Sequence, residues 1–193
     1  MMTETGAGSV LAVVGPTAVR KTALSIRLAQ LLGGEVVSAD SRQIYRGLDI
    51  GTAKATAAER SLVPHHLIDI VDPDQVLTLA QYQEQATAAI AAIQARHALP
   101  FLVGGTGLYV RAVLEGWTVP RVCPDPHLRT ELERLASTEG PQALHDRLAA
   151  IDPLAAQRID ARNVRRVVRA LEVCYANGRP ISEQQDKRPP GYR

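Results

Sequence analysis

The sequence predicts an α/β fold in which a mostly parallel sheet is flanked by helices and followed by an all-helical insertion. Apolar runs of strand length alternate with helix-forming stretches through the first part of the chain, and such alternation is typical of parallel sheets. From Pro120 onward the strand-like runs stop. We therefore expect an α/β core over residues 1–119, a helical insertion over residues 120–178, and the start of a return to the core over residues 179–193.

The first strand is expected to enter a phosphate-binding loop of the P-loop type. An apolar run at residues 10–14 leads into Gly-Pro-Thr-Ala-Val-Arg-Lys-Thr, which matches GxxxxGK[ST] except at Arg20, where the pattern has glycine. Such a loop presents backbone N–H groups, a lysine and a hydroxyl to phosphate and magnesium. An ordinary strand-to-helix turn is the alternative. The predicted diphosphate-binding residues are Gly15, Pro16, Thr17, Ala18, Val19, Arg20, Lys21 and Thr22, with Thr22 as the magnesium ligand.

The remaining elements of the core follow in alternation. The loop opens a helix over residues 21–32, whose Leu24, Leu28 and Leu31 share one face at helical spacing. Thr78, with Gln81 three residues later, resembles a capping box that starts a helix reaching about residue 96. The further predicted strands are residues 35–39, 64–70 and 99–103.

Polar residues follow two of these strands. Asp40 comes after the second strand and Thr106 after the fourth, and ligands of α/β folds gather at the carboxyl ends of strands. The alternatives are that Asp40 caps the next turn and that Thr106 caps the helix it precedes. The glycine-rich segment over residues 47–54 is expected to be a loop whose Lys54 can reach phosphate.

The helical segment ends in an amphipathic stretch over residues 160–177. Three helix starts precede it, at Asp125-Pro126, Gly140-Pro141 and Asp152-Pro153. One side of the last helix is expected to carry Val164, Val167, Val168, Leu171, Cys174 and Tyr175, and the other Arg162, Arg165, Arg166 and Arg169. A basic stripe of this kind fits a phosphate backbone, although a solvated face is the alternative.

Composition narrows the class of protein. The 193 residues are 46% hydrophobic and 22% charged, which is normal for a soluble globular protein, and the net charge of +2 is too small to indicate nucleic-acid binding by itself. We see no secretory signal and no apolar run that could span a bilayer. Cys123 and Cys174 lie outside any CxxC pair, and the histidines are scattered apart from His65-His66. A reduced, cytoplasmic setting without a zinc site or disulfide framework is therefore expected.

Taken together, five ordered blocks resemble the tRNA dimethylallyltransferase family. They are Gly15-Pro16-Thr17-Ala18 with Lys21-Thr22, Asp40-Ser41-Arg42-Gln43-Ile44-Tyr45, Asp49-Ile50-Gly51-Thr52-Ala53-Lys54, Gly104-Gly105-Thr106-Gly107-Leu108-Tyr109 and Arg169-Ala170-Leu171-Glu172-Val173. The resemblance implies transfer of a dimethylallyl group from its diphosphate to the exocyclic amine of the adenosine beside the anticodon. It also implies Mg²⁺ as cofactor, the anticodon arm of tRNA as partner, and a monomer.

The same resemblance assigns roles to residues. Asp40 corresponds to the general base and Thr106 to a residue near the target base, so both are predicted to be catalytic, while Lys21 is central to diphosphate binding. The family takes the target base out of its stack. The residues implied to contact tRNA are Asp40, Ser41, Arg42, Gln43, Thr106, Arg129, Arg165, Arg166, Val167, Val168 and Arg169.

Two features depart from the family pattern. Arg20 replaces the loop glycine, and the chain ends earlier than family members do, so that it looks C-terminally truncated. We expect Arg20 to impair turnover. Two other interpretations remain open on sequence grounds: a P-loop small-molecule kinase that uses a nucleoside triphosphate, and an inactive fragment that still binds tRNA.

Overall fold

The computed structural model describes residues 8–184 and 187–192. These residues divide into two compact units. The sheet unit runs to Trp117 and also includes residues 188–192, whereas the helical unit runs from Thr118 to Lys187. The described part of the chain contains no helix long and apolar enough to cross a membrane.

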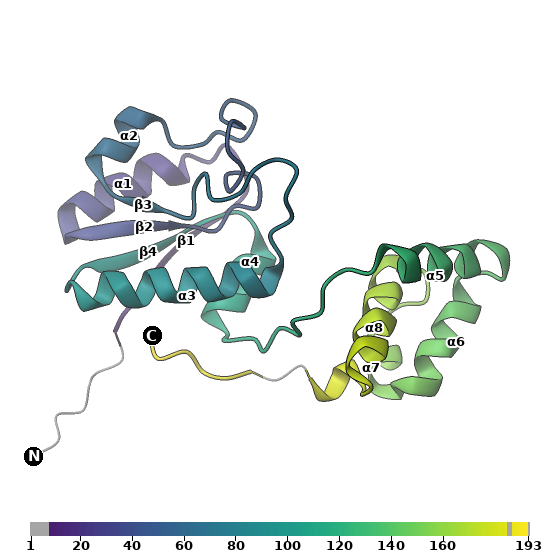
Figure 1. The fold of residues 1–193 in the computed structure, drawn as a ribbon. Coiled ribbons are helices and arrows are strands. Elements are labelled where there is room, and N and C mark those ends of the chain that lie inside the picture. The colour runs from purple at the N-terminus through teal and green to yellow at the C-terminus, as the bar shows by residue number, and fades with distance from the viewer. Residues whose placement is uncertain (1–7, 185–186, 193) are drawn as a thin grey trace, which may run out of the picture. The chain divides into compact units, whose positions relative to one another are not determined.

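The sheet unit is a parallel sheet covered by helices on both faces (Figure 1). The strand order is β1-β4-β2-β3, so the chain crosses over between sequential strands. Its elements are β1 (Leu11–Val14), α1 (Lys21–Leu32), β2 (Gly34–Ser38), α2 (Ala57–Leu62), β3 (His65–His66), α3 (Leu79–Ala95), β4 (Leu99–Gly104) and α4 (Gly107–Leu114). The predicted α/β fold with a parallel sheet is confirmed.

Alternating side chains of the central strands form two apolar layers. Val36 and Phe101 point toward α1, where they meet Ile26 and Ala29. Their neighbours Val37 and Leu102 lie in the other layer, with residues of α3 and α4 such as Tyr82, Ala86, Ile90 and Val113. Both faces of β2 and β4 are thus buried, as expected for central strands of a parallel sheet.

The predicted apolar face of α1 is wrong. Of the predicted Leu24, Leu28 and Leu31, only Leu28 packs against the core, whereas Leu24 and Leu31 are 53% and 78% exposed. The buried residues of the helix are Ser25, Ile26 and Ala29. Small residues on that face allow the helix axis to lie close to the strands, so the leucine spacing does not mark the buried side.

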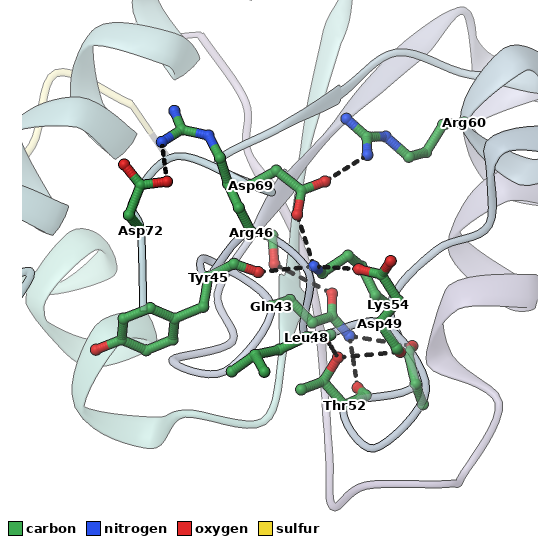
Figure 2. Close-up of polar contacts among 12 residues, drawn as sticks. Gln43, Tyr45, Arg46, Leu48, Asp49, Thr52, Lys54, Arg60, Asp69 and Asp72 are labelled. Carbon is green, nitrogen blue, oxygen red and sulfur yellow. Dashed lines mark hydrogen bonds and ion pairs between the residues drawn. The ribbon is translucent and has the colours of Figure 1, made fainter. Parts of the chain in front are cut away.

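The strand predicted over residues 64–70 is reduced to the two residues of β3. Leu67 and Asp69 have positive φ angles of 61° and 57°, which interrupt the extended backbone that a strand requires. The chain therefore turns shortly after His66, and the Asp69 carboxylate is directed to the loop over residues 47–54 (Figure 2).

The helical unit has one core of its own. Its members include Leu132, Leu144, Leu148, Val167 and Leu171. Its elements are α5 (Pro126–Thr138), α6 (Pro141–Ile151), α7 (Pro153–Arg158), α8 (Val164–Asn177) and the short 3-10 helix η1 (Ile181–Glu183). The three predicted helix starts are confirmed, since Asp125, Gly140 and Asp152 occupy the N-cap positions of α5, α6 and α7.

The last helix begins later than predicted. The Asn163 side chain accepts a hydrogen bond from the Arg166 N–H and caps α8, whereas Asp160 accepts from the Arg162 N–H and pairs with its guanidinium in a separate turn. Arg162 therefore lies outside the helix. Tyr175, predicted in the apolar stripe, is 43% exposed, whereas the predicted core positions Val167, Val168, Leu171 and Cys174 are buried.

Candidate functional site

Three strand ends meet at the carboxyl edge of the sheet and form the floor of a crevice. The Ala39 N–H donates to the Val103 carbonyl (2.7 Å), and the Thr106 N–H donates to the Ala39 carbonyl (3.1 Å). Gly104 is required at this junction, because a Cβ there would lie 2.1 Å from the Ala39 oxygen. This close approach brings Asp40 to the loop that follows β1.

The predicted phosphate-binding loop takes a strained conformation at the position where the pattern calls for glycine. Arg20 has φ 59° and ψ 30°, in the left-handed region, and Ala18 has φ 67°. The left-handed conformation costs a residue with a Cβ about 1–2 kcal/mol of conformational free energy, whereas it costs glycine almost nothing. The Lys21 ammonium donates to the Pro16 carbonyl (2.6 Å) across the loop, which holds this cation over the loop backbone.

A cavity of about 200 Å³ joins this loop to the end of β2. The predicted diphosphate-binding residues Ala18, Arg20, Lys21 and Thr22 line it on one side, and Asp40 and Gln43 on the other. The cavity thus combines cationic and hydroxyl groups suited to phosphate with a carboxylate that can accept a proton.

Asp40 is partly exposed and keeps a free carboxylate oxygen. Its Oδ1 accepts from the Arg42 N–H (2.9 Å), so this residue does cap the turn that follows it, as the alternative interpretation predicted. Among the described residues, Oδ2 has no hydrogen bond and Asp40 forms no ion pair. The residue can therefore hold the turn with one oxygen and act on a ligand with the other.

Thr106 acts on the same turn. Its Oγ1 accepts from the Ser41 N–H (2.9 Å) and donates to Ser41 Oγ (3.2 Å). Although Thr106 occupies the N-cap position of α4, its side chain makes no capping hydrogen bond. The hydroxyl thus ties the end of β4 to the residue that follows Asp40, and it does not line the cavity.

Gln43 connects the cavity to the loop over residues 47–54. Its Nε2 donates to the carbonyls of Thr52 and Ala53, both at 3.2 Å, and Ala53 itself lines the cavity. Sequence analysis predicted Gln43 only as a residue that contacts tRNA. In the structure it also fixes the position of a cavity wall.

The prediction that Lys54 reaches phosphate is wrong. Figure 2 shows its ammonium between two carboxylates, Asp49 and Asp69, each at 2.6 Å, with a third bond to the Tyr45 carbonyl. The side chain is only 3% exposed. Burial lowers the pKa of Lys54, but hydrogen bonds to Asp49 and Asp69 outweigh burial and raise it, so the ammonium stays charged and holds the loop in place.

The helical unit carries the predicted RNA-contacting arginines, with two kinds of environment. Arg165 and Arg166 are exposed. Arg129 and Arg169 are partly buried and both bind Glu172, which is 1% exposed. Val167 and Val168, predicted to contact tRNA, are 0% and 3% exposed and belong to the core, so their side chains do not reach a ligand.

Glu172 was missed as a key residue. Its carboxylate accepts from the Asp125 N–H, from Arg129 Nε and Nη2, each at 2.8 Å, and from Arg169 Nη1 at 2.5 Å. Burial raises the pKa of Glu172, but these hydrogen bonds outweigh burial and lower it to about 2. An acid within the buried stripe of an amphipathic helix, three residues after an arginine, is the sequence signal that indicates such a cluster.

The fold and the crevice define an α/β protein with a P-loop-like fold and a candidate phosphate-binding loop at the carboxyl edge of its sheet. A family model described as IPP transferase matches residues 43–193. The chain belongs to the IPP transferase family.

Curated relatives and solved structures agree with this assignment. The chain is 65% identical over 182 residues to a tRNA dimethylallyltransferase from Roseiflexus sp. (strain RS-1), covering 94% of this chain and 60% of that protein. A tRNA dimethylallyltransferase from Chloroflexus aggregans is 61% identical, with 95% of this chain and 62% of the relative covered. The chain therefore spans about 60% of the length of these curated relatives.

Two solved structures extend the comparison. The full-length tRNA isopentenylpyrophosphate transferase from Bacillus halodurans is 53% identical, with a TM-score of 0.57, and the match covers 89% of this chain and 57% of that one. A eukaryotic dimethylallyltransferase described as acting on tRNA is 32% identical, with a TM-score of 0.73, and the match covers 91% and 44%. At these identities the likeness supports a common ancestry as well as a common fold.

Proposed function

We propose that the protein to which this chain corresponds transfers a dimethylallyl group from dimethylallyl diphosphate to the exocyclic amine of the adenosine beside the anticodon of tRNA. The observation that carries the proposal is the cavity that joins Lys21 and Thr22 to Asp40. Its lining includes a lysine and a hydroxyl residue suited to a diphosphate and a carboxylate suited to accept a proton, and the curated relatives that the chain matches are named tRNA dimethylallyltransferase.

The loop over residues 15–22 would hold the diphosphate of the donor. Lys21 would exchange its bond to the Pro16 carbonyl for phosphate oxygens, and the N–H groups at the start of α1 would add partial positive charge. In the reaction the amine nitrogen forms a bond to the first carbon of the dimethylallyl group while the bond from that carbon to the diphosphate oxygen breaks. The departing diphosphate takes the electron pair, and Lys21 offsets its charge.

Asp40 would act as general base. It takes the proton that the amine loses as the new bond forms, through the carboxylate oxygen that is free of hydrogen bonds. The Arg42 N–H holds the other oxygen and so fixes the carboxylate plane. Thr106 positions this turn through Ser41, which gives it a role in the reaction without placing it in the cavity.

The oxygen donors of the cavity fit Mg²⁺. Thr22 contributes a hydroxyl, which is a hard ligand, and Mg²⁺ commonly completes its shell with water and substrate phosphates. When bound, Mg²⁺ would offset the negative charge that develops on the leaving diphosphate. Among the described residues no group of three or more histidine, cysteine or acidic side chains gathers as a metal site, so few protein ligands are expected.

Each of the two units would contribute residues that contact tRNA. In the sheet unit residues 40–43 and Thr106 would face the target nucleotide, and in the helical unit Arg165 and Arg166 would bind the anticodon arm. Arg129 and Arg169 would use the donors that Glu172 leaves free. We expect a monomer that works in the cytoplasm.

The test is to incubate the purified chain with unmodified tRNA, dimethylallyl diphosphate and Mg²⁺, and to search the digested nucleosides for dimethylallyl-adenosine by mass spectrometry. Its appearance would support the proposal. If the folded chain binds tRNA without modifying it, the chain alone is an inactive tRNA-binding fragment. Transfer from a nucleoside triphosphate to a small acceptor would instead favour a kinase.

A further inference from the structure

The helical unit contains a second cavity, distinct from the crevice. It has a volume of about 300 Å³ and lies between α7, α8 and η1. Four arginines line it: Arg158 from α7 and Arg165, Arg166 and Arg169 from α8. The rest of its wall consists of Ser182 and apolar residues, of which Ala155, Ala170 and Ile181 are at least nine-tenths buried.

The positive charge of this cavity is largely uncompensated. Across the described residues, Arg158, Arg165 and Arg166 form no ion pair and no side-chain hydrogen bond, although all three are exposed. Arg169 alone has an acidic partner, because its guanidinium binds Glu172 and the Val122 carbonyl. Three free cations therefore surround one small space.

The carboxylate of Asp152, which bonds to the wall residues Ala155 and Ser182, makes no direct contact with these cations. Asp152 is 1% exposed, and its carboxylate accepts from the Ser182 N–H (2.8 Å), the Ser182 hydroxyl (2.7 Å) and the Ala155 N–H (2.9 Å). Burial raises the pKa of Asp152, but these hydrogen bonds outweigh burial and lower it, so the group is a satisfied anion that holds η1 against the start of α7. It accepts no arginine hydrogen bond.

Several guanidinium groups around one space repel one another unless an anion lies between them. A phosphate fits this need, because its oxygens accept the paired N–H donors of arginine, and because interactions beside an apolar wall are screened less than those in open water. Arginines on two different helices can hold such a group from two directions. A single solvated helix face cannot do this.

We propose that this cavity binds a backbone phosphate of the RNA substrate and that Arg158 is one of its ligands. The proposal rests on the proposed function, which makes RNA the polyanion available to the helical unit. Arg158 was not among the residues that sequence analysis assigned to tRNA binding, because it lies on α7, outside the amphipathic stretch. Only the folded unit brings it beside Arg165 and Arg166.

The test compares Arg158→Gln with Arg147→Gln in the 193-residue chain. Arg147 is an exposed arginine of α6 that does not line the cavity, so its replacement removes the same charge from the same unit. Binding of unmodified tRNA is measured by fluorescence anisotropy at several salt concentrations. We expect Arg158→Gln to weaken binding about tenfold and to reduce the salt slope by about one, and Arg147→Gln to do much less.

Equal effects of the two variants would overturn the cavity proposal and indicate general electrostatic attraction. If the unaltered chain does not bind tRNA at all, both the cavity proposal and the proposed RNA substrate are wrong. This outcome differs from equal effects of the two variants, which would leave RNA binding itself in place. Arg158→Lys keeps the charge but loses the paired N–H donors of the guanidinium, so it should weaken tRNA binding to an intermediate extent. It replaces Arg158→Gln in the test if thermal melts show that Arg158→Gln is unfolded.

Inorganic phosphate distinguishes the source of the anion. If phosphate at millimolar concentration saturates the cavity without displacing tRNA, the cavity is a small-anion site and the RNA proposal is wrong. Competition between phosphate and tRNA that is weakened by Arg158→Gln and retained in Arg147→Gln would support it.

Discussion

Asp40 in the crevice and Glu172 in the helical unit are both carboxylates set among cationic side chains, but they differ in exposure and in the number of hydrogen bonds that they accept. Asp40 is partly exposed and accepts one hydrogen bond, from the Arg42 N–H. Glu172 is 1% exposed and accepts from two arginines and a backbone N–H. A carboxylate with a free oxygen can receive a proton in a reaction, whereas one whose pKa is held at about 2 remains an anion near neutral pH and serves to position its partners.

The contrast predicts the largest effect for removal of the Asp40 charge. Asp40→Asn keeps an oxygen for the Arg42 N–H but cannot take the proton from the amine, so prenyl transfer should fall by about 10²–10⁴-fold with little change in stability. The rate is measured as dimethylallyl-adenosine formed on tRNA. Asp74→Asn, which changes an exposed loop carboxylate outside the cavity, is the control. A variant at Asp40 that kept most of the rate would remove this residue from the mechanism.

Loss of Glu172 should act on stability instead. Glu172→Ala breaks the bonds to Arg129 and Arg169 and leaves the N–H of Asp125 without its partner, so the free energy of unfolding should fall by about 3 kcal/mol. Urea unfolding followed by circular dichroism gives the measurement. Glu131→Ala, at an exposed position of α5, should change it by less than about 0.5 kcal/mol. Equal stability of the two variants would show that the buried cluster contributes little.

The pH dependence sharpens the same comparison. The pKa of Glu172 is lowered in the folded state, from its ordinary 4.5 to about 2, so its contribution to stability is complete above the ordinary value and is lost as the pH falls toward 2. This shift corresponds to a loss on the order of 3 kcal/mol across that window. Unfolding measured from neutral to acidic pH should therefore show a steeper acid decline for the unaltered chain than for Glu172→Gln. Parallel declines would contradict the assignment.

Residues of the sheet unit differ in how far the sequence could predict their surroundings. Asp40 and Thr106 could be predicted because parallel strands bring their carboxyl ends to one edge, so a local pattern fixes a long-range neighbour. Lys54 could not, because its environment depends on Asp69, whose carboxylate is directed to it by backbone angles that break a predicted strand.

Helix faces show the same limit. In α8 the apolar stripe predicted the core correctly at Val167, Val168, Leu171 and Cys174 but not at Tyr175, which is exposed, and the buried side of this helix is wide. In α1 two of the three predicted leucines, Leu24 and Leu31, are exposed, and the buried residues are Ser25, Ile26 and Ala29. Glu172 and Arg158 are set by contacts with other helices, which spacing along one helix does not reveal.

The smallest predicted effect concerns the strained loop beside Asp40. Arg20→Gly replaces a residue in the left-handed region by the one that tolerates it, so the free energy of unfolding should rise by about 1 kcal/mol. Thermal or urea unfolding measures this gain. Arg20 also lines the cavity. If its side chain crowds the diphosphate, the substitution should in addition speed prenyl transfer.

Ala18→Gly separates these two contributions. Ala18 has a similar positive φ of 67° in the same loop but has only a methyl group to lose. Both variants should gain stability, and only Arg20→Gly should gain rate. Equal transfer rates for Arg20→Gly and the unaltered chain would show that the arginine is tolerated in the cavity. An equal gain in transfer rate for Ala18→Gly would assign the effect to the loop backbone. In either case Asp40 and Lys21 would remain the groups that determine the rate.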